Sequence, residues 1–155
     1  IQAIRASKPD IVLANAIEDR HPDHGRAAKL VRDACFFSGL VKIQTLDTEG
    51  NPQQHWRPKA VYHYIQDYDL KPDFVVDIGS YIEKKFELIR AFSSQFYVPE
   101  ALDYAQELSS PISGQDFMEF LRGKGRTLGR PAGYEFAEGF NVARTIGVGN
   151  LFDLV

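Results

Sequence analysis

The spacing of hydrophobic residues changes several times along the chain, and each change predicts a new element. Ile1 and Ile4 lie three residues apart, which is typical of the last turn of an amphipathic helix, with a short ordered turn as the alternative. Residues 7–10 (Ser-Lys-Pro-Asp) end that helix, because proline disfavours a helical residue before it. Residues 11–14 (Ile-Val-Leu-Ala) form an unbroken apolar run, which predicts a short strand buried on both faces.

The next segments predict a helix and two more strands. Residues 38–39 (Ser-Gly) end a run of apolar residues at helical spacing: Ala27, Leu30, Val31, Ala34 and Cys35. Residues 48–56 are polar and predict a surface loop or the tip of a short hairpin. Apolar and β-branched residues at 60–65 and 74–78 predict strands.

The second half of the chain predicts two helices and a last strand. Ser80 and Ser113 each precede an acidic residue by three positions, which is the pattern of a helix start. Residues 142–148 predict the last strand. Helices between strands imply crossover connections, so the sequence predicts an α/β fold with a mostly parallel sheet. We expect a Rossmann-like, doubly wound arrangement with helices on both faces of the sheet.

Composition narrows the class of protein. A chain of 155 residues and 17.5 kDa with 44% hydrophobic and 25% charged residues suits a single globular domain over residues 1–155. The formal net charge of −3 gives no basic field for nucleic acid. Cys35 is the only cysteine, which excludes an internal disulfide and a cysteine-built zinc module. No apolar run approaches the ~20 residues of a membrane span, and we expect a cytoplasmic protein.

The residues that could form a functional site lie just after the first predicted strand. In open parallel sheets ligands bind beyond the carboxyl ends of strands, and residues 15–25 there contain two of the four histidines. Pro22 and a helix start near Asp23 would hold His21 and His24 facing one locus. A polar loop with two solvated histidines is the alternative. The His-Glu-x-x-His pattern of zinc proteases is absent, and a divided role is more attractive than chelation by both rings.

Five segments in the same order resemble one enzyme family. Residues 19–26 (Asp-Arg-His-Pro-Asp-His-Gly-Arg) resemble the second signature of the PIG-L/LmbE zinc-dependent sugar N-deacetylases. Four further segments resemble the bacillithiol-biosynthesis branch of that family, the N-acetylglucosaminyl-L-malate deacetylases: 57–64, 72–78, 84–96 and 136–140. The resemblance extends over nearly the whole chain.

The resemblance implies roles for individual residues. His24 would be a zinc ligand, His21 the imidazole near the scissile amide, and Asp23 the carboxylate that orients His21. Family members begin with an Ala-His-Pro-Asp-Asp signature that supplies two further zinc ligands and the general base, and this sequence lacks it. We therefore expect a chain that corresponds to the C-terminal two-thirds of such an enzyme, with the N-terminal part missing, and that has no activity alone.

Other residues carry weaker expectations. Arg20 and Arg57 are candidates for carboxylates of the substrate, although a surface salt bridge is the more common use of such residues. Phe136 replaces the usual tyrosine of the family, so any phenol role is lost or moves to Tyr134, and Glu138 either faces the site or ties down its loop. We expect His63 to be a packed strand residue. Residues 122–130 contain three glycines and predict a loop or frayed helix end rather than a phosphate loop.

The sequence therefore predicts a Zn²⁺-dependent hydrolase that removes acetate from a small-molecule sugar, N-acetylglucosaminyl-L-malate. Another sugar N-deacetylase of the family is the nearest alternative, acting on a mycothiol precursor, a phosphatidylinositol glucosaminide or a chitooligosaccharide. A non-catalytic sugar-binding or assembly module is the alternative from a different class. The family resemblance also implies a homo-oligomer, with no nucleic acid and no membrane among its partners.

Overall fold

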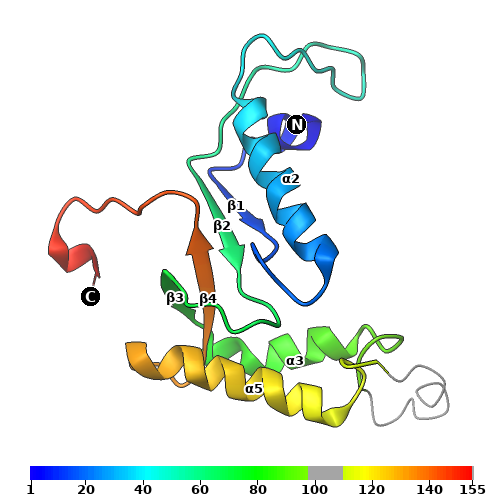
Figure 1. The fold of residues 1–155 in the computed structure, drawn as a ribbon. Helices are drawn as coiled ribbons and strands as arrows, with labels where there is room; N and C mark the ends of the chain where they lie inside the picture. Colours follow the sequence, from blue (N-terminus) through cyan, green and yellow to red (C-terminus); the bar gives the residue numbers. More distant parts are fainter. Residues whose placement is uncertain (98–109, 155) are drawn as a thin grey trace. The chain divides into compact units, whose positions relative to one another are not determined.

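The computed structural model describes residues 1–97 and 110–154 and confirms an α/β fold (Figure 1). The described elements are, in chain order, α1 (Gln2–Ser7), β1 (Ile11–Ala14), α2 (Pro22–Ser38), β2 (Ala60–Tyr64), β3 (Phe74–Asp77), η1 (Gly79–Tyr81), α3 (Ile82–Arg90), α5 (Gln115–Gly129), η3 (Arg130–Ala132), β4 (Ala137–Val142) and η4 (Leu151–Leu154). None of the helices described is long and apolar enough to cross a membrane.

The four described strands form an open, mixed sheet in the order β1-β2-β4-β3. β1 and β2 are parallel, with Ile11 opposite Ala60 and Ala14 opposite His63. β4 runs antiparallel to β2, with Tyr62 opposite Val142. The predicted parallel pairing therefore holds for the first two strands, whereas β4 enters the sheet in the reverse direction.

The last strand lies earlier in the chain than predicted. The strand is Ala137–Val142, and residues 143–148 have no regular structure. The Phe140 ring stacks on Phe74 at 5.2 Å between centroids, and the Asp73 N–H donates to the Phe140 carbonyl at 2.8 Å. The Asp73 carboxylate accepts the Val142 N–H at 2.8 Å, where the ladder ends. These tertiary contacts outweigh the strand propensity of 142–148.

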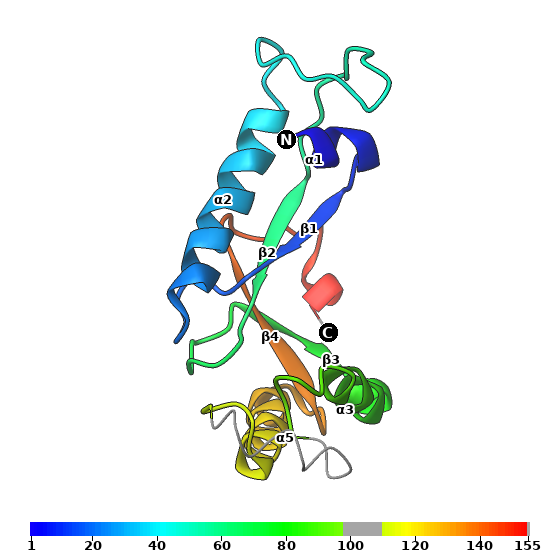
Figure 2. The ribbon, with the colours of Figure 1, turned by 90° about the vertical axis from the view of Figure 1, so that its right-hand side faces the viewer.

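The described chain divides into two compact units. Unit 1 comprises Ile1–Phe74 and Phe140–Val155, and unit 2 comprises Val75–Gly139. In unit 1, α2 lies alongside β1 and β2 (Figures 1 and 2). Ala14 is buried, but Ile11 and Leu13, which alternate with it, are 53% and 60% exposed. The expectation that this strand is buried on both faces is therefore wrong for the described structure, because the face that carries Ile11 and Leu13 is exposed.

α1 is tied to unit 1 by one buried side chain. The α1 helix confirms the helical turn expected at the start of the chain, and it ends at Lys8 in a left-handed conformation (φ 45°). Arg5 is only 2% exposed, and its guanidinium donates to the carbonyls of Ser38, Leu40 and Ile43 at 3.0, 2.9 and 2.7 Å. These carbonyls follow the end of α2, where a positive charge is favourable.

Unit 2 has a large apolar core. Ile82, Phe86, Met118 and Phe136 form a buried cluster that joins α3, α5 and the segment before β4. Two details of the sequence prediction are wrong here. Gly123 and Gly125 lie within α5 instead of in a loop or frayed helix end, and Gly129 is the last residue of the helix, against the backbone of Tyr134. Neither Ser80 nor Ser113 caps a helix: the N-caps of α3 and α5 are Tyr81 and Gly114, without a side-chain capping bond among the described residues.

Candidate active site

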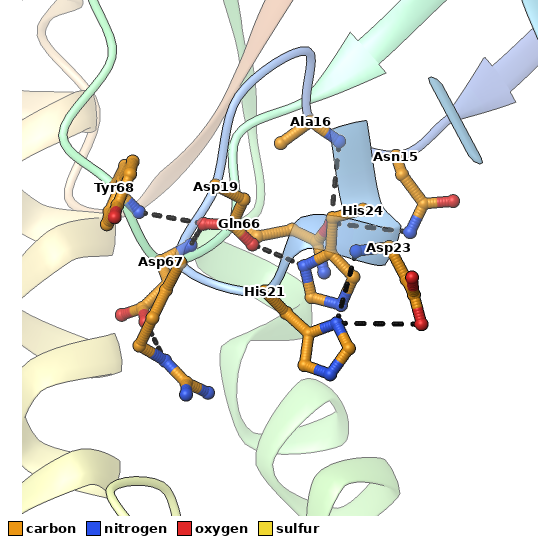
Figure 3. Close-up of polar contacts among 10 residues, drawn as sticks. Asn15, Ala16, Asp19, His21, Asp23, His24, Gln66, Asp67 and Tyr68 are labelled. Carbon is orange, nitrogen blue, oxygen red and sulfur yellow. Dashed lines mark hydrogen bonds and ion pairs between the residues drawn. The ribbon is translucent and has the colours of Figure 1, made fainter. Parts of the chain in front are cut away.

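The two histidines singled out in the sequence lie side by side where α2 begins (Figure 3). His21 is the N-cap residue, with extended backbone angles (φ −88°, ψ 123°), and Pro22 is the first helical residue. Proline suits that position because its fixed φ is already helical and its missing N–H is not needed there. The ring centroids of His21 and His24 are 5.4 Å apart. The local sequence thus builds a rigid pair of imidazoles.

The His21 ring caps the helix. Its Nδ1 accepts a hydrogen bond from the Asp23 N–H at 3.2 Å. A nitrogen that accepts this bond carries no proton, so the proton of the neutral ring lies on Nε2. The Asp23 carboxylate is 3.9 Å from His21 Nδ1 and instead binds Arg26 Nη1 at 3.0 Å. The carboxylate role of Asp23 therefore stays a prediction, while its backbone N–H already orients the ring.

The His24 ring is engaged by a buried carboxylate. Nδ1 of His24 contacts Asp19 Oδ2, and the Asp19 side chain is 1% exposed. Asp19 Oδ1 accepts the backbone N–H groups of Asp67 and Tyr68, each at 3.0 Å. Burial alone would raise the pKa of the Asp19 carboxyl, but the hydrogen bonds from His24 and from backbone N–H groups outweigh it and lower the pKa. Nε2 is the ring nitrogen of His24 that Asp19 leaves unoccupied.

Further polar contacts join the loop after β1 to the loop after β2. Gln66 Oε1 accepts from Asn15 Nδ2 and from the Ala16 N–H, both at 3.4 Å. Arg20 Nε donates to Asp67 Oδ2 at 2.6 Å. Sequence reasoning missed Asp19 and Gln66 as parts of this site. Asp19 lies inside the quoted signature, but its partners stand 48 and 49 residues later, and no local pattern reveals such a contact.

The structure does not bring every predicted site residue to this place. Arg20 lies beside the histidines, but Arg57 stacks on Phe36 (4.6 Å) and donates to its carbonyl, near the other end of α2. The 17 residues of α2 make the helix about 25 Å long. Arg57 is thus remote from the imidazole pair.

The remaining predicted residues belong to unit 2. Tyr134 is 43% exposed, and Glu138 on β4 binds Lys85 Nζ on α3 at 2.6 Å. Phe136 is buried in the apolar core. Their assignment to the substrate stays a prediction.

His63 is a buried strand residue, as expected. It is 2% exposed, and its Nδ1 lies 2.8 Å from the Asn15 carbonyl, to which it donates. This bond fixes the chain where β1 ends and the site loop begins.

The donor set fits a zinc ion in part. A zinc-binding imidazole normally has its second nitrogen bonded to a carboxylate or carbonyl, and His24 with Asp19 shows this arrangement. A catalytic zinc site takes about three protein ligands. Among residues 1–97 and 110–154, no three His, Cys, Asp or Glu side chains gather in such a group. The described residues therefore contribute one suitable ligand and do not complete a site.

A curated relative of this chain is a sugar deacetylase. No family model matches the chain. The diacetylchitobiose deacetylase of Thermococcus kodakarensis is 30% identical over 142 residues, which cover 90% of this chain and 47% of the relative. This chain therefore spans about half the length of the curated relative that it matches.

Solved structures share the fold. The conserved protein TT1542 from Thermus thermophilus aligns with a TM-score of 0.74 at 26% identity, over 96% of this chain and 58% of that chain. The N,N'-diacetylchitobiose deacetylase from Pyrococcus horikoshii aligns with a TM-score of 0.70 at 24% identity, over 99% and 54%. The 4-carboxy-2-hydroxymuconate hydratase GalB from Pseudomonas putida has a TM-score of 0.65 at 19% identity, over 96% and 58%.

The chain shares its fold with these solved structures, among them the N,N'-diacetylchitobiose deacetylase. In sequence the chain is related to a diacetylchitobiose deacetylase. Because a hydratase shares the same fold, the fold alone does not fix the reaction, and the chemistry has to be argued from the site.

Proposed function

We propose that this chain belongs to a zinc-dependent N-deacetylase that removes acetate from an N-acetylglucosaminide. The observation that carries the proposal is the pair of adjacent imidazoles, because their Nδ1 atoms make opposite kinds of contact. His21 Nδ1 accepts a backbone N–H, whereas His24 Nδ1 faces a buried carboxylate. One ring is thereby prepared as a hydrogen-bond donor and the other as a metal ligand. The relationship to a sugar deacetylase supports this division.

His24 would bind the metal through Nε2. When bound, zinc polarises the acetyl carbonyl and lowers the pKa of a coordinated water toward ~7. The role of the chain at this point is to hold one imidazole, its Nδ1 against Asp19, at a fixed place at the start of α2.

His21 would act on the amide that is cleaved. Its Nε2–H can donate to the carbonyl oxygen as negative charge develops there, and later give a proton to the departing amine. The N-terminus of α2 adds a positive partial charge at the same place, which favours the developing anion.

We propose that the other zinc ligands and the general base come from outside the residues that the structure describes. Two observations support this. The described residues hold no group of three potential metal ligands, and the sequence relative is about twice as long as the aligned segment.

The proposed substrate is N-acetylglucosaminyl-L-malate, on the strength of the five collinear segments described above. Arg20 is a cationic group beside the histidines that could meet a malyl carboxylate, although Asp67 already binds its Nε. Arg57 has no such support because of its distance along α2. The second candidate is a chitooligosaccharide such as N,N'-diacetylchitobiose, which the 30% identical relative favours.

The test uses the protein expressed from its complete coding sequence. Acetate release is measured with both substrates, with zinc and after its removal, and zinc content is measured per protein. We expect His24→Ala to lose zinc and activity together. We expect His21→Ala to keep zinc and to slow turnover by about 10²–10³-fold.

His55→Ala is the matched control, since His55 is exposed and distant in sequence from the site. It should leave zinc content and turnover unchanged. Equal loss of zinc in the His21 and His24 variants would show that both are ligands and that the division of roles is wrong. Turnover that does not depend on zinc would refute the proposed function.

A further inference from the structure

We propose that Asp19 is a positioning residue for His24: its buried carboxylate, held by the loop after β2, places the imidazole proton on Nδ1 and leaves Nε2 as the metal-binding nitrogen. The proposal rests on the proposed function, because the choice of tautomer matters only if His24 binds a metal. It adds a residue and a loop to which neither the sequence pattern nor the comparisons give a role.

The first step is the charge of Asp19. A carboxylate that is 1% exposed is costly unless hydrogen bonds compensate for lost water. Here the N–H groups of Asp67 and Tyr68 both donate to Oδ1. Two N–H donors on one oxygen favour the ionised form, which accepts hydrogen bonds from both. Asp19 is therefore an anion that can only accept hydrogen bonds.

The second step is the tautomer of His24. Oδ2 of Asp19 contacts Nδ1 of His24, and an ionised carboxylate cannot donate to that nitrogen. The proton must then lie on Nδ1, because the other tautomer would bring two acceptors into contact. A neutral imidazole with its proton on Nδ1 has its lone pair on Nε2, which is the form that binds a metal.

The third step is what fixes Asp19 itself. Its Oδ1 is bound to backbone N–H groups, which cannot rotate away as side chains can. Arg20 binds the Asp67 carboxylate, and Gln66 binds the chain at Ala16, so the same loop is attached on both sides of Asp19 (Figure 3). The loop after β2 thus sets the position of a side chain that would ligate metal on α2.

Asp19→Asn is the sharpest test because the amide has nearly the same shape. Its oxygen can still accept the two backbone N–H groups, but its NH₂ would face His24 Nδ1 and donate to it. The imidazole proton would then move to Nε2. In metal-free, histidine-labelled protein at about pH 9, where an ordinary histidine is neutral, nitrogen chemical shifts should show Nδ1–H in the parent protein and Nε2–H in the variant.

The same variant should weaken zinc binding by about 10–100-fold, as expected when the outer partner of a metal-binding histidine is lost. Glu18→Gln is the matched control: it removes the same charge one residue earlier, from an exposed side chain, and should change neither the tautomer nor the zinc affinity.

Two results would overturn the proposal. One is a His24 proton on Nε2 in the parent protein, a measurement that needs no variant and stands even if Asp19→Asn fails to fold. The other is a folded Asp19→Asn protein with unchanged tautomer and zinc affinity. The two proposals fail in different ways. If the tautomer shifts as expected while acetate release proves independent of zinc, the proposed function fails and the positioning role of Asp19 remains.

Discussion

The two compact units bury different kinds of side chain. In unit 1 the described buried residues other than Pro58 and Phe140 are small or polar: Arg5, Ala14, Ala16, Ala28, Cys35, Ser38 and His63. In unit 2 the buried side chains larger than a methyl group are all apolar among the described residues: Ile82, Phe86, Met118 and Phe136. Unit 1 therefore depends on matched donors and acceptors, whereas unit 2 depends on filled volume. The candidate active site lies in the unit whose interior is specified by hydrogen bonds.

The two kinds of interior respond differently to substitution. An apolar core tolerates changes of shape as long as its volume is kept. A hydrogen-bonded interior loses a partner with every chemical change, and a lost partner leaves a polar group buried without compensation. A site that needs one proton on a particular nitrogen is better built on the second kind of interior. Four predictions test the comparison, from the largest expected effect to the smallest.

Phe86 is the most buried large side chain of unit 2, at 1% exposure. We expect Phe86→Ala to lower the free energy of unfolding by about 3–5 kcal/mol, because it leaves a cavity. Phe86→Leu keeps most of the volume and should cost about 1 kcal/mol. Chemical denaturation followed by circular dichroism measures both. Equal costs for the two variants would show that volume is not what this core requires.

Arg5 provides the opposite case in unit 1. Arg5→Met keeps the length of the side chain but removes the guanidinium bonds to the Ser38, Leu40 and Ile43 carbonyls, and should lower the free energy of unfolding by about 3 kcal/mol. Arg5→Lys should recover part of this loss. Trp56, the only tryptophan, donates to the Pro9 carbonyl at 2.8 Å, so its fluorescence reports on unit 1. If Arg5→Met lowered the free energy of unfolding by less than about 1 kcal/mol, the claim that unit 1 depends on matched donors and acceptors would be wrong.

Gly129 tests how tightly unit 2 is packed at its backbone. A Cβ there would lie 2.7 Å from the Tyr134 carbonyl oxygen and 3.1 Å from the Ala137 nitrogen. We expect Gly129→Ala to destabilise by about 1–3 kcal/mol, because backbone atoms would have to move.

Gly123 on the same helix is the matched control. No described atom lies within 4 Å of its added Cβ, so Gly123→Ala should stabilise the helix by up to about 1 kcal/mol. Melting temperatures of the two variants should shift in opposite directions. Shifts in the same direction would refute the close approach at Gly129.

Asp73 gives the smallest effect. The Val142 N–H and Asn141 Nδ2 donate to its carboxylate, at 2.8 and 3.2 Å, and lower its pKa. A lowered pKa contributes stability above the ordinary carboxyl pKa of about 4, and this contribution is lost as pH falls through the lowered value. The group is exposed, so we expect less than about 0.5 kcal/mol.

The measurement is the change in unfolding free energy between pH 6 and pH 2, compared between the parent protein and Asp73→Asn. The parent should lose slightly more stability on acidification. Asp69→Asn, an exposed carboxylate four residues earlier, should behave as the parent does. An identical pH dependence of the Asp73 variant and the parent would contradict the role given to Asp73.

Most elements could be predicted from the sequence because their signals are local. The apolar runs at β1, β2 and β3 and the helical spacing in α2 need no distant partner to be recognised. β4 was misplaced because its sequence contains Glu138 and Gly139, and its pairing depends on Phe74 and Tyr62, which lie far back in the chain. The glycines of α5 likewise suggested a loop, although Gly129 stands where the helix approaches another segment of backbone closely.

The candidate site was predictable in the same local sense. His21, Pro22 and His24 are neighbours, so their joint position at a helix start follows from a few residues. The engagement of Asp19 by Asp67 and Tyr68 does not, because it depends on how two loops meet. The placement of Arg57 at the far end of α2 was missed for the same reason.

The arrangement around Arg5 also bears on motion. One guanidinium binds the carbonyls of Ser38, Leu40 and Ile43 and the Thr45 hydroxyl at once, from a helix more than thirty positions away along the chain. If the segment after α2 opened by itself, the Arg5 guanidinium would lose these hydrogen-bond acceptors. Fluctuations of α1 and of residues 38–45 are therefore coupled into one cooperative event, rarer and larger than the independent fraying expected of a short first helix and a surface loop.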